Sequence, residues 1–196
     1  MANYYIADLH LGHLNAMVRF DKRPFKTLDE QDKTIIDNIN RVVTPQDNLF
    51  LLGDVSWYKP DKTAELIRQI NCKNRFLVRG NHDRWADDST CKKLFQGIYD
   101  LKRIDDKGRI VVLCHFPMAV WDQSHRGSYH IYGHVHRNIT ETEMKTTTTH
   151  NILKHEEMIN AFNVGCMLPS INYIPRTKYL FLQFICRISS DVLSGL

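Results

Sequence analysis

Residues 74–83 read NRFLVRGNHD, an apolar run that stops at Gly80 and is followed at once by Asn81, His82 and Asp83. The run has the apolar and aromatic content of a buried β-strand. The amide, imidazole and carboxylate that follow it are groups that bind metal ions or carry protons. These residues form either an ordinary polar turn or one part of a functional site, and the rest of the chain decides between the two.

Two earlier segments have the same design, because each is an apolar run that ends at an aspartate. Residues 3–7 (NYYIA) are followed by Asp8, and residues 48–54 (NLFLLGD) end on Asp54. Runs of this length and composition predict buried strands. Three strands are therefore expected to carry polar side chains at their carboxyl ends.

Amphipathic helices are predicted between these strands, at residues 28–43 and 61–70, where apolar positions recur at helical spacing. Asp61 is expected to cap the second helix. The order strand, helix, strand, helix, strand indicates parallel β-α-β units covered on both faces. In such sheets ligands bind outside the carboxyl ends of the strands, so the polar side chains at the three strand ends are expected to meet.

The second half of the chain has a different pattern. Residues 108–115, 128–136 and 160–165 read as strands that are joined by loops rather than by clear helices. The threonine-rich residues 140–150 are interpreted as a loop or an exposed hairpin, with a strand as the competing interpretation. The tail at 177–196 alternates like a strand but also fits a helix, and either form would be buried.

The composition is that of an ordinary globular protein, with 43% hydrophobic and 24% charged residues in a chain of 196. We expect a single domain over residues 1–196, because no linker or internal repeat is visible. Lysine and arginine exceed aspartate and glutamate by 26 − 22 = +4. This mild excess permits an anionic substrate, but it does not indicate a dedicated nucleic-acid surface.

The cysteines and the apolar segments favour a cytoplasmic protein without a membrane partner. The five cysteines are odd in number and include no CxxC pair, so free thiols are expected rather than disulfides or a zinc-thiolate site. The longest apolar run, residues 179–186, is too short to cross a bilayer. The N-terminus lacks the pattern of a signal peptide.

Five short polar motifs stand at the predicted strand ends and supply carboxylate, amide and imidazole groups but no sulfur. Such a donor set suits manganese, iron or zinc in a catalytic setting. Residues two apart in an extended segment point to the same side, so each D-x-H or H-x-H pair is expected to reach one metal ion together. In chain order the motifs are Asp8-x-His10, Gly53-Asp54, Gly80-Asn81-His82-Asp83, His115 and Gly133-His134-x-His136.

Together the five motifs resemble the pattern of the calcineurin-like metallophosphoesterases, namely D-x-H, GD, GNH(D/E), H and GHxH. The resemblance covers roughly residues 3–175 and is greatest to the small bacterial and phage branch of the family. That branch is indicated by DLHLGHLN at 8–15, RPF at 23–25, and NVG followed by Y-x-P within 163–175. The resemblance implies a four-layer α/β/β/α sandwich, in which a central β-sandwich is flanked by helices.

The resemblance also implies a site for two divalent metal ions, with manganese favoured and iron, zinc or nickel as alternatives. A hydroxide that bridges the two metals would attack phosphorus, while His82 faces the leaving group as proton donor. Asp83 is considered as a residue that orients His82 or contacts substrate. Carried over position by position, one metal is held by Asp8, His10 and His136, the other by Asn81, His115 and His134, and Asp54 bridges them. His82, Asn81 and Asp54 are thus the expected catalytic residues.

Several further side chains are candidates for contacts at this site. His13 is expected to contact either a metal ligand or a phosphate, with a turn-capping histidine in a surface loop as the alternative. Arg23 is considered as a contact to a substrate phosphate, with a solvated arginine as the alternative. Trp57, Trp85 and Trp121 follow the polar motifs, so one of them could line the pocket and stack on a base, although core packing is the default interpretation.

We therefore expect a metal-dependent phosphoesterase that acts on small phosphodiesters or phosphomonoesters, nucleotide-derived ones among them. The segment GDVSWYK at 53–59 lacks the acid and arginine of the GDxVDRG motif, which argues against a protein serine/threonine phosphatase. Three alternatives stay open: a nuclease that processes nucleic-acid ends, a nucleotide pyrophosphatase, and a non-catalytic scaffold with the same fold. The natural substrate, the native metal and the oligomeric state are not predicted.

Overall fold

A computed structural model of the protein describes residues 1–136 and 160–179. The threonine-rich segment 140–150 and the tail beyond residue 179 lie outside the described residues, and so do the expectations for them. Over the two described ranges, none of the helices combines the length and the apolar composition that a membrane span requires.

The first sheet has the strand order β1-β2-β3-β4, and every neighbouring pair in it is parallel. The predicted β-α-β units are therefore confirmed, and the three predicted strands are β1, β2 and β3. The short strand β4 at the edge was not predicted. The strands are β1 (Asn3–Ile6), β2 (Asn48–Leu52), β3 (Asn74–Val78) and β4 (Gly97–Tyr99).

The two long helices begin where the local sequence favours a helix start. Helix α1 (Leu28–Val42) begins at Thr27, whose hydroxyl accepts a hydrogen bond from the Glu30 N–H. Helix α2 (Pro60–Arg68) begins after Lys59, with proline at its first position. The prediction that Asp61 caps this helix is wrong, because Pro60 sets the helical backbone one residue earlier and places Asp61 in the first turn.

Short helical segments that were not predicted connect the longer elements. They lie mostly in loops, where few residues bury an apolar face and the periodic signal is correspondingly weak. These segments are a π-helical turn (Ala16–Phe20), a 3-10 turn (Arg84–Asp87), helix α3 (Ser89–Lys92) and a second 3-10 turn (Ser124–Arg126).

The second sheet has the order β5-β6-β7-β8 and mixes strand directions. Strands β5 and β6 form an antiparallel hairpin, whereas β6, β7 and β8 run parallel to one another. The chain crosses from the first sheet to the second at Asp100, between β4 and β5. The strands are β5 (Leu101–Asp106), β6 (Arg109–Cys114), β7 (Tyr129–Tyr132) and β8 (Ala161–Asn163).

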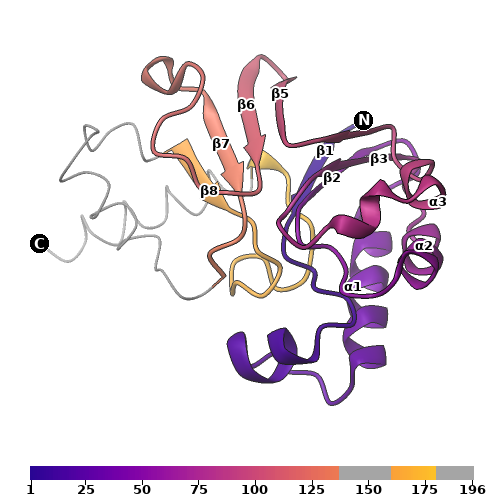
Figure 1. Cartoon of the computed structure of the whole chain (residues 1–196). Helices are drawn as coiled ribbons and strands as arrows, with labels where there is room; N and C mark the ends of the chain where they lie inside the picture. Colours follow the sequence, from indigo (N-terminus) through magenta and orange to yellow (C-terminus); the bar gives the residue numbers. More distant parts are fainter. Residues whose placement is uncertain (137–159, 180–196) are drawn as a thin grey trace, which may run out of the picture.

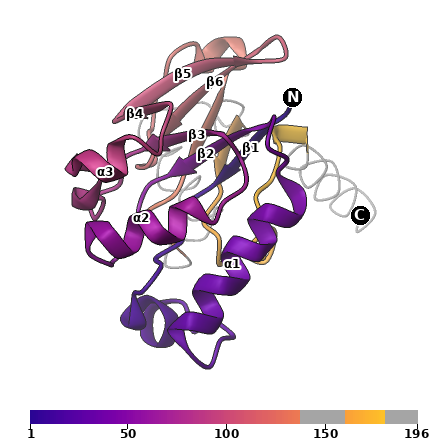
Figure 2. The same ribbon diagram turned by 90° about the vertical axis from the view of Figure 1, so that its right-hand side faces the viewer.

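The two sheets share one apolar core, and α1 and α2 cover the opposite face of the first sheet (Figures 1 and 2). This arrangement of two sheets flanked by helices confirms the expected α/β sandwich. Fully buried side chains from all layers meet in the same cluster, among them Leu51 and Leu77 of the first sheet, Leu113 and Ile131 of the second, and Ile39 and Ile67 of the helices.

Candidate metal centre

The polar motifs lie at one edge of the two sheets, because the strands that precede them are parallel within each sheet. Strands β1, β2 and β3 end there in the first sheet, and β6 and β7 end there in the second. Asp8 and His10 follow β1, Asp54 follows β2, and Asn81 and His82 follow β3. In the second sheet, His115 follows β6, and His134 and His136 follow β7.

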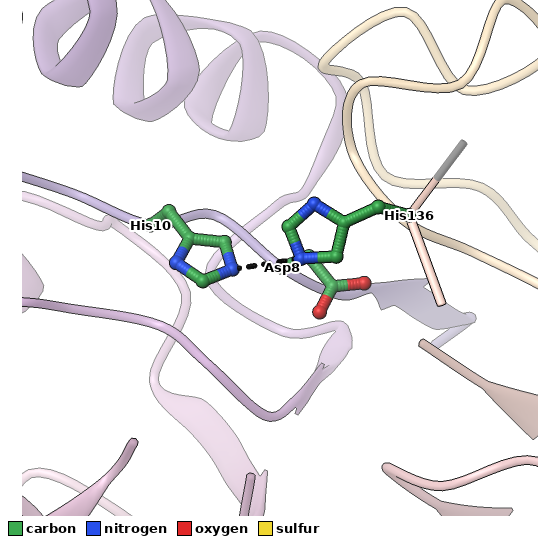
Figure 3. A group of neighbouring side chains, drawn as sticks. All are labelled: Asp8, His10 and His136. Atoms are coloured by element: carbon green, nitrogen blue, oxygen red, sulfur yellow. Dashed lines mark hydrogen bonds between the residues drawn. The ribbon is translucent and has the colours of Figure 1, made fainter. Parts of the chain in front are cut away.

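Six of these residues form two groups of three that could each hold a metal ion. In each group the three ligand atoms lie within 4.8 Å of one another. Figure 3 shows the first group, in which the imidazoles of His10 and His136 face one another beside the carboxylate of Asp8. The first group is Asp8, His10 and His136, and the second is Asp54, His115 and His134.

Five of these residues have a left-handed backbone, which is uncommon for side chains other than glycine and clusters at functional sites. Their φ angles lie between 48° and 71°, so the D-x-H and H-x-H segments are not extended. The expectation that each pair reaches one metal together holds for Asp8 and His10 but is wrong for His134 and His136. Strand β7 ends at Tyr132, and the turns that follow it send the two histidines into different groups.

Glycines allow the loops to approach closely, as the sequence suggested. A Cβ atom on Gly53, whose φ is +78°, would lie 2.3 Å from Nδ1 of His115. A Cβ atom on Gly80 would lie 2.2 Å from Oδ1 of Asp54. Any side chain at these two positions would push the loops of the site apart.

The carboxylate of Asp54, a member of the second group, also faces the first group. Its Oδ2 is 3.8 Å from Nε2 of His10 in one group and 3.5 Å from Nε2 of His115 in the other. Its Oδ1 accepts a hydrogen bond from the His82 N–H at 3.0 Å. Burial alone would raise the pKa of Asp54, but the neighbouring His115, His82 N–H and His10 lower it to about 2. An ionised carboxylate thus faces both groups.

The imidazole of His115 has the donor chemistry of a metal ligand. Its Nδ1 lies 2.8 Å from the carbonyl of Leu52, to which it must donate its proton. Its Nε2 is the nitrogen left to bind a metal ion; this atom is buried and has no hydrogen-bond partner among the described residues. Burial opposes protonation of His115, but Asp54, whose Oδ2 lies 3.5 Å from Nε2, raises the pKa of His115, and a metal cation between the two would take the place of that proton. The residues of the second group fit a divalent metal.

The first group also fits a divalent metal ion. Nδ1 of His136 donates to Oδ1 of Asp21 at 2.8 Å, which leaves Nε2 of His136, 3.1 Å from Nε2 of His10, as the nitrogen that can face a metal ion. Burial, followed by the nearby His136, lowers the pKa of His10 to about 2, so this imidazole is neutral near pH 7. Burial raises the pKa of Asp8 to about 6. Imidazole nitrogens and a carboxylate gathered at one point are a donor set that suits a divalent cation.

Asp21 was not predicted, and its partner Arg23 has a role different from the expected one. The two side chains are fully buried and form an ion pair at 2.8 Å. The guanidinium also donates to the carbonyls of Leu9 at 2.7 Å and Asp8 at 3.0 Å. The solvated alternative is therefore wrong, and burial of the guanidinium does not support the expected contact with a substrate phosphate. Arg23 instead ties the loop of the first group to the carboxylate that orients His136.

Asp83 holds the ends of β2 and β3 together. Its carboxylate is 2% exposed and accepts four hydrogen bonds of 2.8 to 3.1 Å, and none of them comes from His82. The suggested role of orienting His82 is thus not supported. The donors are the backbone N–H groups of Asp54, Val55 and Gly80 and the indole N–H of Trp85.

We expect Asp83→Ala to lower the free energy of unfolding by about 3 kcal/mol, since buried donors would lose their acceptor. The measurement is urea denaturation of the metal-free protein. The control is Asp87→Ala, which removes an exposed carboxylate paired with Arg79 and should leave the free energy of unfolding nearly unchanged. Equal losses in the two variants would contradict the role assigned to Asp83.

The remaining candidates surround the two groups. The side chain of His82 is 40% exposed, and its Nε2 lies 4.0 Å from Oδ2 of Asp54. Asn81 is exposed and lines the same cavity as His82. His13 is buried, and its Nδ1 lies 3.0 Å from Nδ1 of His10, so it contacts a candidate ligand.

Comparison with known proteins identifies the family. Residues 4–106, just over half of the chain, match the family described as calcineurin-like phosphoesterase. The chain belongs to the calcineurin-like phosphoesterase family. The match spans both strands that precede Asp8 and Asp54 and extends past the GNHD motif, so this phosphoesterase has its first three polar motifs within the matched range.

The chain is also similar to individual proteins in sequence or in fold. The phosphoesterase is 32% identical over 137 residues to the uncharacterized protein MJ1445 of Methanocaldococcus jannaschii, which covers 69% of each chain. Its fold is similar to that of AQ665 from Aquifex aeolicus, a protein of unknown function, with a TM-score of 0.69 and 24% identity over 93% of this chain and 98% of that one. The YfcE phosphoesterase of E. coli has a TM-score of 0.40 and 16% identity over 69% and 70% of the two chains.

Proposed function

We propose that this calcineurin-like phosphoesterase hydrolyses small phosphodiesters or phosphomonoesters, nucleotide-derived ones among them, with the help of two divalent metal ions. The position of Asp54 carries the proposal. Its ionised carboxylate lies within 4 Å of a histidine nitrogen from each three-residue group. A carboxylate in that position can be shared between two cations, as two-metal phosphoester chemistry requires.

The proposed ligands follow from the two groups and from the family resemblance. We assign Asp8, His10 and His136 to one ion, His115, His134 and Asn81 to the other, and Asp54 to both. Manganese is the favoured ion, and iron, zinc or nickel would suit the same nitrogen and oxygen donors. When bound, such ions supply Lewis acidity, which generates a nucleophile from water and neutralises charge on the phosphoryl oxygens.

The protein's own residues supply geometry and a proton. The Asp8 carboxylate is fixed by the His134 N–H, which lies 3.1 and 3.0 Å from its two oxygens. The His82 N–H fixes the orientation of Asp54. The half-exposed imidazole of His82 is not a member of either group and can therefore reach a substrate. In this proposal His82 donates a proton to the oxygen of the leaving group.

The direct test is a screen of phosphoesters with the chelated protein reloaded separately with manganese, nickel, iron or zinc. Turnover of p-nitrophenyl phosphate or bis-p-nitrophenyl phosphate is expected with at least one metal and not with the chelated protein. The preferred substrate would separate monoesterase from diesterase activity. Elemental analysis provides the control, because two bound ions without any turnover would favour a scaffold over an enzyme.

Asp21→Asn is expected to weaken manganese binding at the first group by about 10- to 100-fold, because outer carboxylates orient histidine ligands and raise their basicity. Calorimetric titration of the folded, chelated variant measures this loss. The matched control is Asp122→Asn, which alters an exposed carboxylate paired with Arg103. An unchanged manganese affinity in Asp21→Asn would show that the hydrogen bond to His136 does not orient a ligand.

A further inference from the structure

A cavity of about 810 Å³ opens beside His82, and its lining combines two tryptophans and a tyrosine with polar side chains. This volume is within the range of sites that bind small molecules. The cavity is formed by the loops after β2 and β3, which also carry Asp54 and Asn81. Its lining includes Trp57, Tyr58, Trp85, Asn81, His82 and Arg84. It therefore continues the candidate metal centre on the side of the proposed proton donor.

Trp57 forms an exposed aromatic wall that is held in place. The side chain is 45% exposed, although one face of the indole stacks on His13 with ring centroids 3.8 Å apart and planes 6° apart. The indole centroid lies 4.3 Å from that of His82 and 6.2 Å from that of His10. A large aromatic side chain that is rigidly held, exposed and next to a reactive group has the features of a ligand platform.

The other two aromatic walls are fixed as well. The Tyr58 hydroxyl is hydrogen-bonded to the buried carboxylate of Asp32, and burial together with that carboxylate raises the pKa of Tyr58 to about 12. The indole N–H of Trp85 donates to Asp83 at 3.1 Å. All three rings thus have partners outside the cavity, so a planar ligand could bind without a large cost for ordering them.

We propose that this cavity binds the leaving group of the substrate and that this group carries a planar aromatic base, as a nucleoside does. The base would contact the exposed part of Trp57, whose indole centroid lies 4.3 Å from that of the His82 ring. The sugar would then lie beside His82, which protonates the departing oxygen. Asn81 and Arg84 add an amide and a cation at the lining, where they can contact polar atoms of the nucleoside. This inference rests on the proposed phosphoesterase function and specifies its substrate class.

The test compares substrates that differ only in the base. Adenosine 5′-phosphate and methyl β-D-ribofuranoside 5-phosphate release the same kind of primary alcohol from the same closed sugar ring, so kcat/KM for the two isolates the contribution of the base. Their methyl diesters extend the comparison to diesterase activity. Base stacking on an aromatic side chain predicts a preference of about tenfold or more for the adenosine compounds. Trp57→Ala should collapse this ratio towards one, whereas Trp57→Phe should retain part of it.

Tyr179→Ala is the control, because Tyr179 is an exposed aromatic side chain that contacts Lys107 and not a residue of the candidate metal centre. The ratio of the two kcat/KM values in this variant should equal that of the wild type. Equal kcat/KM for the two substrates in the wild type, or an unchanged ratio in Trp57→Ala, would overturn the aromatic leaving-group site. Equilibrium binding of both compounds to the manganese-loaded protein tests the aromatic leaving-group site separately from the phosphoesterase function. Preferential binding of the adenosine compound without turnover would support the site but contradict the phosphoesterase function. Neither turnover nor preferential binding would overturn both.

Discussion

Asp54→Asn is expected to lower kcat/KM by on the order of 10³-fold or more and to reduce the number of metal ions bound per chain. The physical reason is the position of its carboxylate, whose Oδ2 faces Nε2 of His10 and of His115. A neutral amide removes the negative charge that two neighbouring cations would share.

Kinetics with the preferred p-nitrophenyl ester and elemental analysis of the same samples measure the two effects of Asp54→Asn. The control is Asp122→Asn, an isosteric change at an exposed carboxylate paired with Arg103, which should retain both metals and full activity. A variant that loses activity but retains two ions would assign Asp54 to catalysis without a bridging role. Retention of full activity together with two bound ions would refute the proposed metal centre.

His82→Ala is expected to leave metal binding intact and to lower kcat by about 10²- to 10⁴-fold, the range for loss of a general acid. Metal binding should be unaffected while kcat falls, because the side chain of His82 is 40% exposed and does not belong to either three-residue group. The loss should be larger for an alkyl ester than for a p-nitrophenyl ester, since nitrophenolate leaves readily without a proton.

The kinetics of His82→Ala should be measured with both kinds of ester and with metal content determined in parallel. His125→Ala serves as the control, because His125 is exposed in the 3-10 turn Ser124–Arg126 and should be neutral. Equal losses for good and poor leaving groups would assign His82 a role other than proton donation. Full activity would remove it from the mechanism.

The sheet and the polar strand ends could be predicted because their signals are local. Residues 3–7, 48–54 and 74–80 are apolar runs of strand length that stop at glycine or aspartate, and parallel pairing then brings their ends together. Strand β5 was missed because its sequence, LKRIDD, is exposed at alternate positions and lacks an apolar run. The edge strand β4 has only three residues, too few for a periodic signal.

The partners of the site residues could not be predicted, because they depend on contacts between distant segments. The bond from Asp21 to His136 joins residues 115 positions apart, and the four bonds of Asp83 depend on how closely β2 and β3 approach. An arginine beside a polar motif is expected to contact solvent or substrate. Arg23 is instead buried and donates to backbone carbonyls. The spacing of His134 and His136 likewise did not indicate that both residues have a left-handed backbone.

The most direct test of the proposed centre is electron paramagnetic resonance of the chelated protein titrated with manganese(II), with bound metal counted in the same samples. A carboxylate shared between two sites predicts two ions per chain and, because such ions lie roughly 3.5–4 Å apart, a spectrum of a spin-coupled pair. In Asp54→Asn the coupled signal should be lost. Saturation at one ion per chain, or two ions that give only the spectrum of isolated manganese(II), would contradict the proposal that Asp54 joins two metal sites.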